Sequence, residues 1–454
     1  MNPRVFREYD IRGNADRDLE TAFVADLGRA IGTHLQRARS RRITLGRDCR
    51  VHSPRLHAAL KEGLLSTGID VIDVGVVATP TLYFSVFHLD TDGGVQITGS
   101  HNPPEDNGFK ILRGKSTIHG EEIQQLRALI DKRDFMSGAG SYEQRDVSAA
   151  YVDTCASKIQ LGPRRFKVVV DAGNGVGGLA VPLLRKLGFD VTELYCEPDG
   201  RFPHHHPDPT VEKNVADLKR TVAEVGAEVG IALDGDADRI GVVDAKGRIV
   251  WGDQLMILFA RSILEEVPGA TFVSEVKCSK ALYDEIARAG GRAIMWKVGH
   301  SLIKEKMKAE GALLAGEMSG HIFFAHRYFG YDDAIYSAAR LCELLSKGAR
   351  TLSEHVDTLP KFFNTPEIRY ELPDELKFEV VRRVVAHFKQ QSDSKVVDVD
   401  GARVTWPDGW ALVRASNTQP ALVLRFEAET QERLVVIQTL VEGVLKRIEA
   451  EARR

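Results

Sequence analysis

The stretch Thr98-Gly99-Ser100-His101-Asn102-Pro103-Pro104 directly follows a short apolar run, Gly94-Val95-Gln96-Ile97. An apolar run bounded by turn residues is typical of a buried strand, and Gly, Asn and a Pro pair end such a strand abruptly. We expect this turn to lift the Ser100 hydroxyl into solvent, beside His101 and not far from Lys110. Such residues also form ordinary surface turns, so the interpretation depends on the other stretches of the chain.

A strand–helix unit that ends in a polar turn occurs three times. The first unit has strands at 43–48, 69–77 and 94–97 and a helix at 53–66, and it ends at the Ser100 turn. The second has strands at 166–171, 189–194 and 229–233 and helical stretches at 179–187 and 211–225, and it ends at residues 234–239. The third has strands at 270–277, 292–296 and 312–315 and helices at 280–289 and 302–309, and it ends at residues 316–321.

This alternation predicts three α/β domains with mainly parallel sheets. Ligands of such sheets bind at the carboxyl ends of the strands, so we expect the three turns to face one shared cleft. Residues 362–454 differ, with a helix at 378–388, strands at 395–399, 410–414 and 421–427, and a long helix at 431–448. The predicted domains are 1–148, 149–250, 251–361 and a smaller α+β domain at 362–454.

Composition excludes several classes of function. Of the 454 residues, 43% are hydrophobic and 28% are charged, which is typical of a globular protein with an ample core. A net charge of −3 gives no reason to expect a nucleic-acid partner. The five scattered cysteines contain no C-x-x-C pair, which argues against a disulfide framework or a structural zinc site. We expect a cytoplasmic protein with no signal peptide and no membrane contact.

Asp234, Asp236 and Asp238 alternate with small residues after a predicted strand. In an extended segment, side chains two residues apart point the same way, so three carboxylates would crowd together and repel unless a cation lay among them. Ligands that are all oxygens suit Mg²⁺. The EF-hand pattern fails, because Ala245 occupies the twelfth position. A phosphorylated Ser100 would complete the site, and Arg239 and Lys110 could neutralise a phosphoryl group in transfer.

Other polar stretches suggest contacts with a sugar phosphate. Arg414, with the turn residues Ser416, Asn417 and Thr418, is suited to clamp a phosphate, helped by Arg425. Glu317 and Ser319 can bind adjacent sugar hydroxyls, and His321 has a pKa range suited to proton transfer. Lys277 and His300 end strands of the same predicted domain and are further candidates for phosphate or hydroxyl contacts.

Two further motifs have alternative readings. Gly173-Asn174-Gly175-Val176-Gly177-Gly178 matches the G-x-G-x-x-G pattern of dinucleotide-binding proteins, with Glu193 at about the expected later position. That pattern keeps a dinucleotide oxidoreductase open as an alternative, although it would leave the three aspartates without a role. His204-His205-His206 lies among prolines with no cysteine nearby, which predicts a rigid exposed loop rather than a metal tract.

Taken together, these stretches resemble the α-D-phosphohexomutase superfamily, in particular its bacterial phosphomannomutase/phosphoglucomutase branch. The resemblance extends over nearly the whole chain. It rests on these segments: 9–13, 98–104, 234–239, 297–300, 316–321 and 414–420. The family fold is heart-shaped, with three similar α/β domains of mixed sheets and a smaller fourth domain around a central cleft.

The resemblance also implies roles for individual residues. Ser100 is the expected phosphoserine and, with the three aspartates, binds Mg²⁺. The expected catalytic residues are Ser100, His101, Lys110, Arg239, Arg12 and His321. The expected substrate contacts are Tyr9, Arg12, Lys277, His300, Glu317, Ser319, His321, Arg414, Ser416, Asn417, Thr418 and Arg425. We expect a monomer that acts on small hexose phosphates, with glucose 1,6-bisphosphate or mannose 1,6-bisphosphate as activator and intermediate.

The implied reaction is a reversible phosphoryl shift between O1 and O6 of glucose and mannose phosphates. Met318 favours these sugars, because the phosphoglucosamine mutase branch commonly has Gln there, and that branch is the first alternative. A non-catalytic sugar-phosphate binding protein is an alternative of another class. Two positions depart from the family pattern: Ala237 replaces a usual Gly and Val298 a common Thr. Ala237 would be strained if its φ angle were positive.

Overall fold

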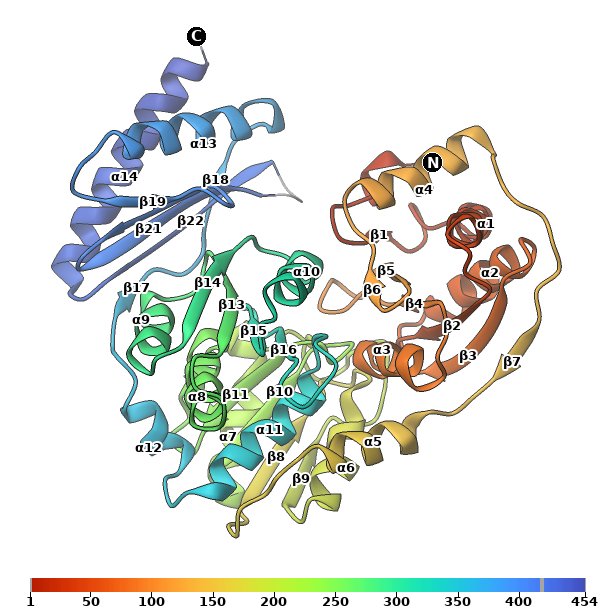
Figure 1. Ribbon diagram of the computed structural model, residues 1–454, viewed down its shortest axis with the longest axis horizontal. Helices are drawn as coiled ribbons and strands as arrows, with labels where there is room; N and C mark the ends of the chain where they lie inside the picture. Colours follow the sequence, from red (N-terminus) through yellow and green to blue (C-terminus); the bar gives the residue numbers. More distant parts are fainter. Residues whose placement is uncertain (1, 417–419, 454) are drawn as a thin grey trace.

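The computed structural model describes residues 2–416 and 420–453. Within them the chain forms four sheets, each with its own helices (Figure 1). In Figure 1 the first sheet lies at the right, the second at the bottom, the third left of centre and the fourth at the upper left. The first and fourth parts thus form two lobes above the second and third, which is the heart shape that the resemblance implies.

The first sheet has the strand order β1-β5-β4-β2-β3-β7, and β6 pairs with β5. These strands are β1 (Ile11–Asn14), β2 (Arg42–Arg47), β3 (Asp70–Val76), β4 (Gly93–Ile97), β5 (Asp106–Arg113), β6 (Ser116–Thr117) and β7 (Tyr142–Gln144). The associated helices are η1 (Pro3–Val5), α1 (Thr21–Arg37), α2 (Ser53–Leu65), α3 (Thr79–His88) and α4 (Glu121–Lys132). Apolar side chains of α1, α2 and α4 share one core with the sheet, whereas those of α3 join the core of the second and third parts.

The second sheet has the order β12-β11-β10-β8-β9. Its strands are β8 (Lys167–Asp171), β9 (Asp190–Leu194), β10 (Val229–Leu233), β11 (Ile240–Asp244) and β12 (Ile249–Val250). Its helices are α5 (Ser148–Ser157), η2 (Gly177–Leu179), α6 (Ala180–Lys186), η3 (Glu212–Val215) and α7 (Ala216–Val225). All five residues of β10 are buried, as expected for a continuous apolar run covered on both faces.

The third sheet has the order β14-β13-β15-β16. Its strands are β13 (Thr271–Glu275), β14 (Arg292–Trp296), β15 (Leu314–Gly316) and β16 (Ile322–Phe324). Its helices are α8 (Gly252–Glu266), α9 (Lys280–Arg288), α10 (His300–Glu310), α11 (Ala334–Lys347) and α12 (Leu352–Asp357). The side chain of Asp333 caps the N-terminus of α11 by accepting from the Tyr336 amide, which fixes where this helix begins.

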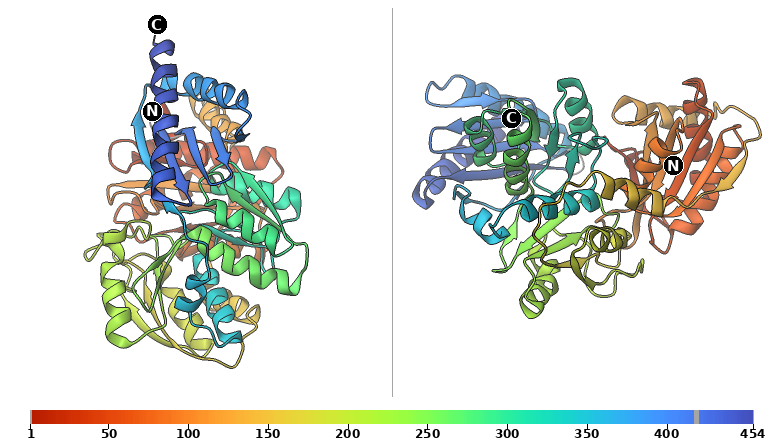
Figure 2. Two further views of the ribbon diagram at one scale, coloured as in Figure 1. Left: turned by 90° about the vertical axis from the view of Figure 1, so that its left-hand side faces the viewer. Right: turned by 60° about the horizontal axis from the view of Figure 1, so that its bottom comes forward.

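The fourth sheet is antiparallel, with the order β17-β22-β21-β20-β19, and β18 also pairs with β22. Its strands are β17 (Phe363–Asn364), β18 (Ile368–Glu371), β19 (Lys395–Val397), β20 (Ala402–Trp406), β21 (Gly409–Ala415) and β22 (Ala421–Ala428). Two helices, α13 (Asp374–Lys389) and α14 (Gln431–Ala452), pack on it around a separate apolar core. The right-hand view of Figure 2 shows this part at the opposite end of the molecule from the first sheet.

The first three sheets are mixed: each has the parallel strands that the strand–helix alternation predicted, and each also has antiparallel strands at one edge. In each, a parallel strand leads through a polar turn into an antiparallel neighbour: β4 into β5, β10 into β11, and β15 into β16. The turn needs only a few residues, so the chain returns as a hairpin instead of crossing over through a helix. These hairpin turns are the three polar stretches found in the sequence, so they occupy equivalent places in three similar sheets.

Among the described residues, no helix is both long and apolar enough to cross a membrane.

Candidate active site

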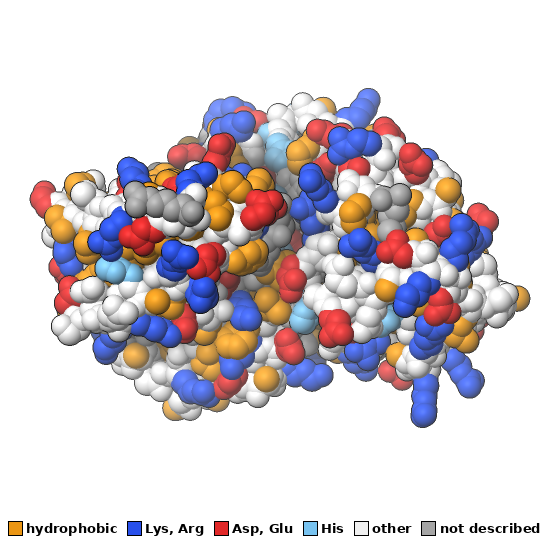
Figure 3. Space-filling model, turned by 90° about the horizontal axis from the view of Figure 1, so that it is seen from above, with side chains coloured by type: hydrophobic (Ala, Val, Ile, Leu, Met, Phe, Trp, Pro, Cys, Tyr) orange, Lys and Arg blue, Asp and Glu red, His pale blue; other side chains and the backbone are white. Residues whose placement is uncertain are grey.

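One cavity of about 1100 Å³ takes side chains from all four parts of the chain. Seen from above, the surface is hollowed between the two halves of the molecule (Figure 3). The candidate residues that line the cavity are Tyr9, Arg12, Ser100, His101, Lys110, Arg239, Lys277, His300, Glu317, Ser319, His321, Arg414, Ser416 and Arg425. Asp234, Asp236 and Asp238 are fully buried beneath this lining. Asn417 and Thr418 lie outside the described residues.

Ser100 is buried, with only 2% of its surface exposed, so the expectation of a solvent-exposed hydroxyl was wrong. The acidic loop of the second sheet covers the turn, and the Ser100 hydroxyl donates to Asp234 Oδ2 at 2.7 Å. The hydroxyl also lies 3.0 Å from His101 Nδ1. A Cβ at Gly235 would fall 2.4 Å from the Ser100 carbonyl oxygen, so only glycine lets the two loops meet this closely.

The three aspartates form a buried carboxylate cluster whose ligand oxygens all lie within 4.8 Å of one another. Burial, and then the negative charges of Asp238 and Asp236, raise the pKa of Asp234 well above its usual range. One oxygen each of Asp236 and Asp238 is buried without a hydrogen-bond partner. Unsatisfied carboxylate oxygens at this spacing, with no nitrogen or sulfur ligand in the cluster, fit a hard divalent cation such as Mg²⁺.

Two residues of the first part of the chain contact the same carboxylate cluster, Lys110 in β5 and Thr79 in α3. The Lys110 ammonium forms ion pairs with Asp236, at 3.2 Å, and with Asp238. Thr79, at the start of α3, donates its hydroxyl to Asp236 Oδ2 at 2.6 Å and its amide to the Asp236 carbonyl at 2.9 Å. These charges and donors outweigh burial and lower the pKa of Asp236. Sequence reasoning missed Thr79, whose only signal was a Thr-Pro helix start directly after a strand.

The glycine-rich stretch 173–178 packs against the acidic loop. A Cβ at Gly175 would fall 2.6 Å from the Gly235 carbonyl oxygen, and the Val176 amide donates to that oxygen at 3.1 Å. Glycine here permits the close approach of two loops, which accounts for the pattern without a dinucleotide. Ala237, which replaces the glycine usual in the family, has a φ angle of +59°. A residue with a Cβ is strained in this left-handed conformation.

Arg50 was missed by sequence reasoning and holds the Ser100 turn in place. Its guanidinium is fully buried and is oriented by Asp48, whose Oδ2 also accepts from the Gly99 amide at 3.0 Å. The guanidinium donates to four backbone carbonyls of the turn, those of Ser100, Asn102, Pro103 and Asp106. Sequence gave no sign of this role, because an arginine after a strand is usually exposed.

The histidine loop 204–206 was predicted to be exposed, but only His204 is. His205 binds the carboxylate of Asp171, and His206 Nε2 lies 2.6 Å from the carbonyl oxygen of His101. The loop therefore supports the Ser100 turn from the side of the second sheet. Contacts between parts far apart in the sequence, which no local pattern encodes, explain the difference.

The third sheet contributes His321, Glu317 and His300. Arg239 Nε donates to His321 Nε2 at 2.9 Å, and Glu317 Oε1 accepts from the Gly299 amide at 2.7 Å. Burial, followed by the charge of Lys304, lowers the pKa of His300 well below its usual range, so this ring is neutral at pH 7.

The fourth sheet and the strand end at Lys277 bring cations to the far side of the cavity. Arg414 pairs with Asp400 at 3.2 Å, and Lys277 pairs with Glu367 at 3.4 Å. Arg425 donates to the carbonyl oxygen of Lys277. Arg414 and Lys277 thus face internal carboxylates, and a phosphate could replace those carboxylates as their partner.

Tyr9 and Arg12 come from the start of the chain. The Tyr9 hydroxyl donates to the Val298 carbonyl at 2.7 Å and so links the first and third parts across the cavity. Arg12 donates to Asn102 Oδ1 at 2.7 Å and pairs with Asp10. Burial, followed by the charge of Arg239, lowers the pKa of His101 well below its usual range.

Comparison with known proteins agrees with this geometry. Four family models match along the chain, described as Phosphoglucomutase/phosphomannomutase alpha/beta/alpha domain I at residues 3–137, domain II at 149–247, domain III at 251–363 and the C-terminal domain at 367–442. A Pseudomonas aeruginosa protein named phosphomannomutase/phosphoglucomutase is 46% identical over 448 residues, covering 98% of this chain and 96% of its own.

The chain belongs to the phosphoglucomutase/phosphomannomutase family. A phosphoglucomutase of Neisseria gonorrhoeae is 44% identical over 97% of this chain and 96% of its own length. The crystal structure of a phosphoglucomutase/phosphomannomutase family protein from Burkholderia thailandensis superposes with a TM-score of 0.94 at 40% identity, covering 99% of this chain and 98% of that one. The predicted superfamily, fold class and isomerase activity of a phosphohexomutase are confirmed.

Proposed function

We propose that this member of the phosphoglucomutase/phosphomannomutase family shifts a phosphoryl group between O1 and O6 of glucose and mannose phosphates through a phosphoserine at Ser100. The observation that carries the proposal is the 2.7 Å contact between the Ser100 hydroxyl and Asp234 in a buried carboxylate cluster. A phosphate on Ser100 would bring more negative charge to this cluster, which only a cation could hold there. Asp234, Asp236 and Asp238 would bind Mg²⁺, which supplies charge neutralisation for the phosphoryl group.

The chemistry divides among residues of different sheets. As the sugar hydroxyl forms a new bond to phosphorus, the bond from phosphorus to Ser100 Oγ breaks, and the hydroxyl proton must leave. His321, with Nε2 at the cavity, is the group we assign to accept it. Arg239 and Lys110 offset the charge of the transferred group, and His101 and Arg12 flank Ser100. The product of this half-reaction is a 1,6-bisphosphate, which also serves as activator.

The far phosphate requires a site that accepts either end of the sugar. We assign this site to Lys277, Arg414, Ser416 and Arg425, with Asn417 and Thr418 as further members. The sugar hydroxyls form hydrogen bonds with Glu317, Ser319 and His300. Tyr9 closes the cavity beside these residues. Release and rebinding of the bisphosphate in the opposite orientation then let Ser100 take back the other phosphate. One chain supplies residues of all four parts to the cavity, which supports action as a monomer.

A coupled assay tests the reaction and its sugar. We expect turnover of glucose 1-phosphate and mannose 1-phosphate with Mg²⁺ and the bisphosphate activator. Preferred turnover of glucosamine phosphate would instead show that the protein is a phosphoglucosamine mutase. Binding of a sugar phosphate without turnover would show that it is a non-catalytic binding protein.

Replacing Ser100 tests the serine relay. We expect Ser100→Ala to lower kcat by at least about 10³-fold, because the covalent acceptor is lost, with little change in stability. Intact mass should show one phosphate on the wild type after treatment with bisphosphate and none on the variant. Ser157→Ala, at the exposed end of α5, is the matched control and should keep full activity. Near-full activity of Ser100→Ala would refute the relay.

A further inference from the structure

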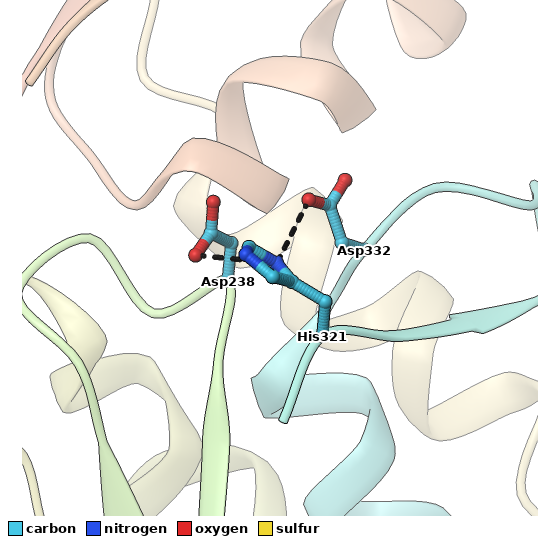
Figure 4. A group of neighbouring side chains, drawn as sticks. All are labelled: Asp238, His321 and Asp332. Carbon is cyan, nitrogen blue, oxygen red and sulfur yellow. Dashed lines mark ion pairs between the residues drawn. The ribbon is translucent and has the colours of Figure 1, made fainter. Parts of the chain in front are cut away.

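The imidazole of His321 lies between two fully buried carboxylates, those of Asp238 and Asp332 (Figure 4). His321 Nδ1 is 3.2 Å from Asp332 Oδ2 and 3.6 Å from Asp238 Oδ1. At the other side of the ring, Arg239 Nε donates to Nε2 at 2.9 Å. The ring is thus placed by one cation and two anions from two loops, the acidic loop that holds Asp238 and Arg239 and the loop before α11 that holds Asp332.

The contact with Arg239 determines which ring nitrogen carries the proton. Arginine remains protonated in proteins and can only donate hydrogen bonds. Nε2 of His321 must therefore present its lone pair to Arg239, and the proton of the neutral imidazole lies on Nδ1. The Nδ1–H group lies on the side of the ring that faces the carboxylates of Asp238 and Asp332.

Asp332 is the better acceptor for this proton. Asp238 already pairs with Lys110 and belongs to the carboxylate cluster that we assign to the cation. Asp332 Oδ1 accepts from Lys304 at 3.0 Å, whereas its Oδ2 has no aligned hydrogen bond among the described residues, and neither has His321 Nδ1. His300 Nδ1 lies farther from Asp332 Oδ2, at 3.8 Å. Asp238 Oδ1 is also buried without a partner, but it lies farther from His321 Nδ1, at 3.6 Å, so Asp332 Oδ2 is the nearer acceptor.

The charge state of Asp332 agrees with this pairing. Burial alone would raise the pKa of Asp332, but Lys304 and His321 outweigh it and lower the pKa well below its usual range. Asp332 is therefore an anion that can accept from Nδ1.

We propose that Asp332 is a positioning residue that holds the proton of His321 on Nδ1 and so directs the Nε2 lone pair at the substrate. Glu317 Oε2 lies 3.9 Å from Nε2, which places the lone pair where we expect a sugar hydroxyl to bind. The inference rests on the proposed function: the hydroxyl proton moves to Nε2 as oxygen attacks phosphorus, and Arg239 turns from Nε2 to the phosphate. The Nδ1 proton stays in place, and the Asp332 carboxylate stabilises the imidazolium until the proton returns to the leaving oxygen.

Nuclear magnetic resonance tests the tautomer without requiring turnover. The full-length protein is labelled with nitrogen-15 in histidine, and His321→Gln identifies the signals of His321 by difference. At a pH where the ring is neutral, we expect the proton on Nδ1 in the wild type and a shift of population towards Nε2–H in Asp332→Asn. A proton on Nε2 in the wild type would overturn the proposal, whatever the protein's activity.

Kinetics tests the consequence for catalysis. We expect Asp332→Asn to lower kcat about 10- to 100-fold, with KM for hexose phosphate changed less than about threefold, and Asp332→Glu to recover part of the loss. The matched control is Asp333→Asn, since Asp333 is about as buried as Asp332 but accepts from Tyr151 and Tyr328 instead of facing His321. Its kcat should stay within about twofold of wild type.

An Asp332→Asn variant with wild-type kcat would refute the positioning role. If Asp332→Asn fails to fold, two other measurements test the positioning role. A wild-type proton on Nε2, or an Asp332→Glu variant with wild-type kcat, would refute it. A wild type without mutase turnover would refute the proposed function instead, and the tautomer measurement would still test the placement of His321.

Discussion

Two residues of the site, Ser100 and Ala237, have positive φ angles, of +49° and +59°. The left-handed conformation costs a residue with a Cβ about 1–2 kcal/mol, and such strain is often found at functional sites. At Ser100 the conformation accompanies a hydroxyl that meets Asp234 across the interface between two sheets. At Ala237 the side chain is buried in the apolar core, and only the burial of its methyl group offsets part of the strain.

We therefore predict that Ala237→Gly stabilises the protein. Glycine adopts this φ angle without strain, and we expect the free energy of unfolding to rise by about 0.5 kcal/mol at most once the lost burial of the methyl group and the greater freedom of the unfolded glycine are counted. Urea unfolding of the two proteins measures the difference. Ala338→Gly, inside α11 and equally buried, is the control and should lower stability by about 1 kcal/mol. A less stable Ala237→Gly would show that the turn does not strain Ala237.

At the scale of elements, each of the three site turns joins a parallel strand to an antiparallel one, but the Ser100 turn needs outside support. It runs from Ile97 to Asp106, and two prolines remove backbone donors from it. Arg50 supplies the missing donors by binding four carbonyls of the turn from one side. The conformation of the turn is thus set by a residue that precedes α2, about 50 positions earlier in the chain.

We predict that Arg50→Lys damages both stability and turnover. A lysine keeps the charge but cannot reach several carbonyls with one planar group, so we expect a loss of about 2–3 kcal/mol of stability. A displaced Ser100 should lower kcat at least about tenfold.

Urea unfolding and the coupled assay measure the two effects of Arg50→Lys. Arg55→Lys is the control, because Arg55 also donates to backbone carbonyls, but to those of Ala15 and Leu19 and not to those of the Ser100 turn. An unchanged kcat in Arg50→Lys would show that the Ser100 turn keeps its conformation without the arginine.

At the scale of the whole molecule, the first three parts of the chain are joined more tightly than the fourth. Side chains of α3 and of the second and third sheets form one continuous apolar core, whereas the fourth sheet has a core of its own. A small cluster of Val276, Trp410 and Leu412 joins the fourth part to the third. We expect the fourth part to move relative to the others when substrate enters, since small interdomain contacts permit such motion.

A buried carboxylate between the second and third parts, that of Asp333, predicts that the stability of the protein depends on pH. Asp333 accepts from the hydroxyls of Tyr151 and Tyr328, and burial raises its pKa to about 6. An acid with a raised pKa binds its proton more tightly in the folded state, so its contribution to stability is largest below about pH 4 and falls as the pH rises through 6. Asp333→Asn cannot ionise, so its stability relative to wild type should improve by about 2 kcal/mol from pH 4 to pH 7.

Urea unfolding at the two pH values measures this change. The control is Asp357→Asn, in which an exposed carboxylate beside Arg248 and Lys246 is replaced. Hydrogen bonds from Arg248 and Lys246 lower the pKa of Asp357 to about 2, so its contribution is constant between pH 4 and pH 7. Equal pH profiles for wild type and Asp333→Asn would contradict the assigned pKa.

The sequence by itself determined the parallel strands of the first three sheets and the chemistry of their turns, but not the antiparallel strands β5, β11 and β16 that follow those turns. A continuous apolar run such as β10 identifies a buried strand from local sequence alone. Carboxylates two residues apart, as in Asp234, Asp236 and Asp238, likewise indicate a cation site from local geometry alone. The tertiary structure decided which groups meet. Three features join segments tens to hundreds of residues apart: the burial of Ser100 against Asp234, the support from Arg50 and Thr79, and the placement of His321 beside Asp238. Such contacts depend on how whole sheets pack, and no pattern of neighbouring residues records that packing.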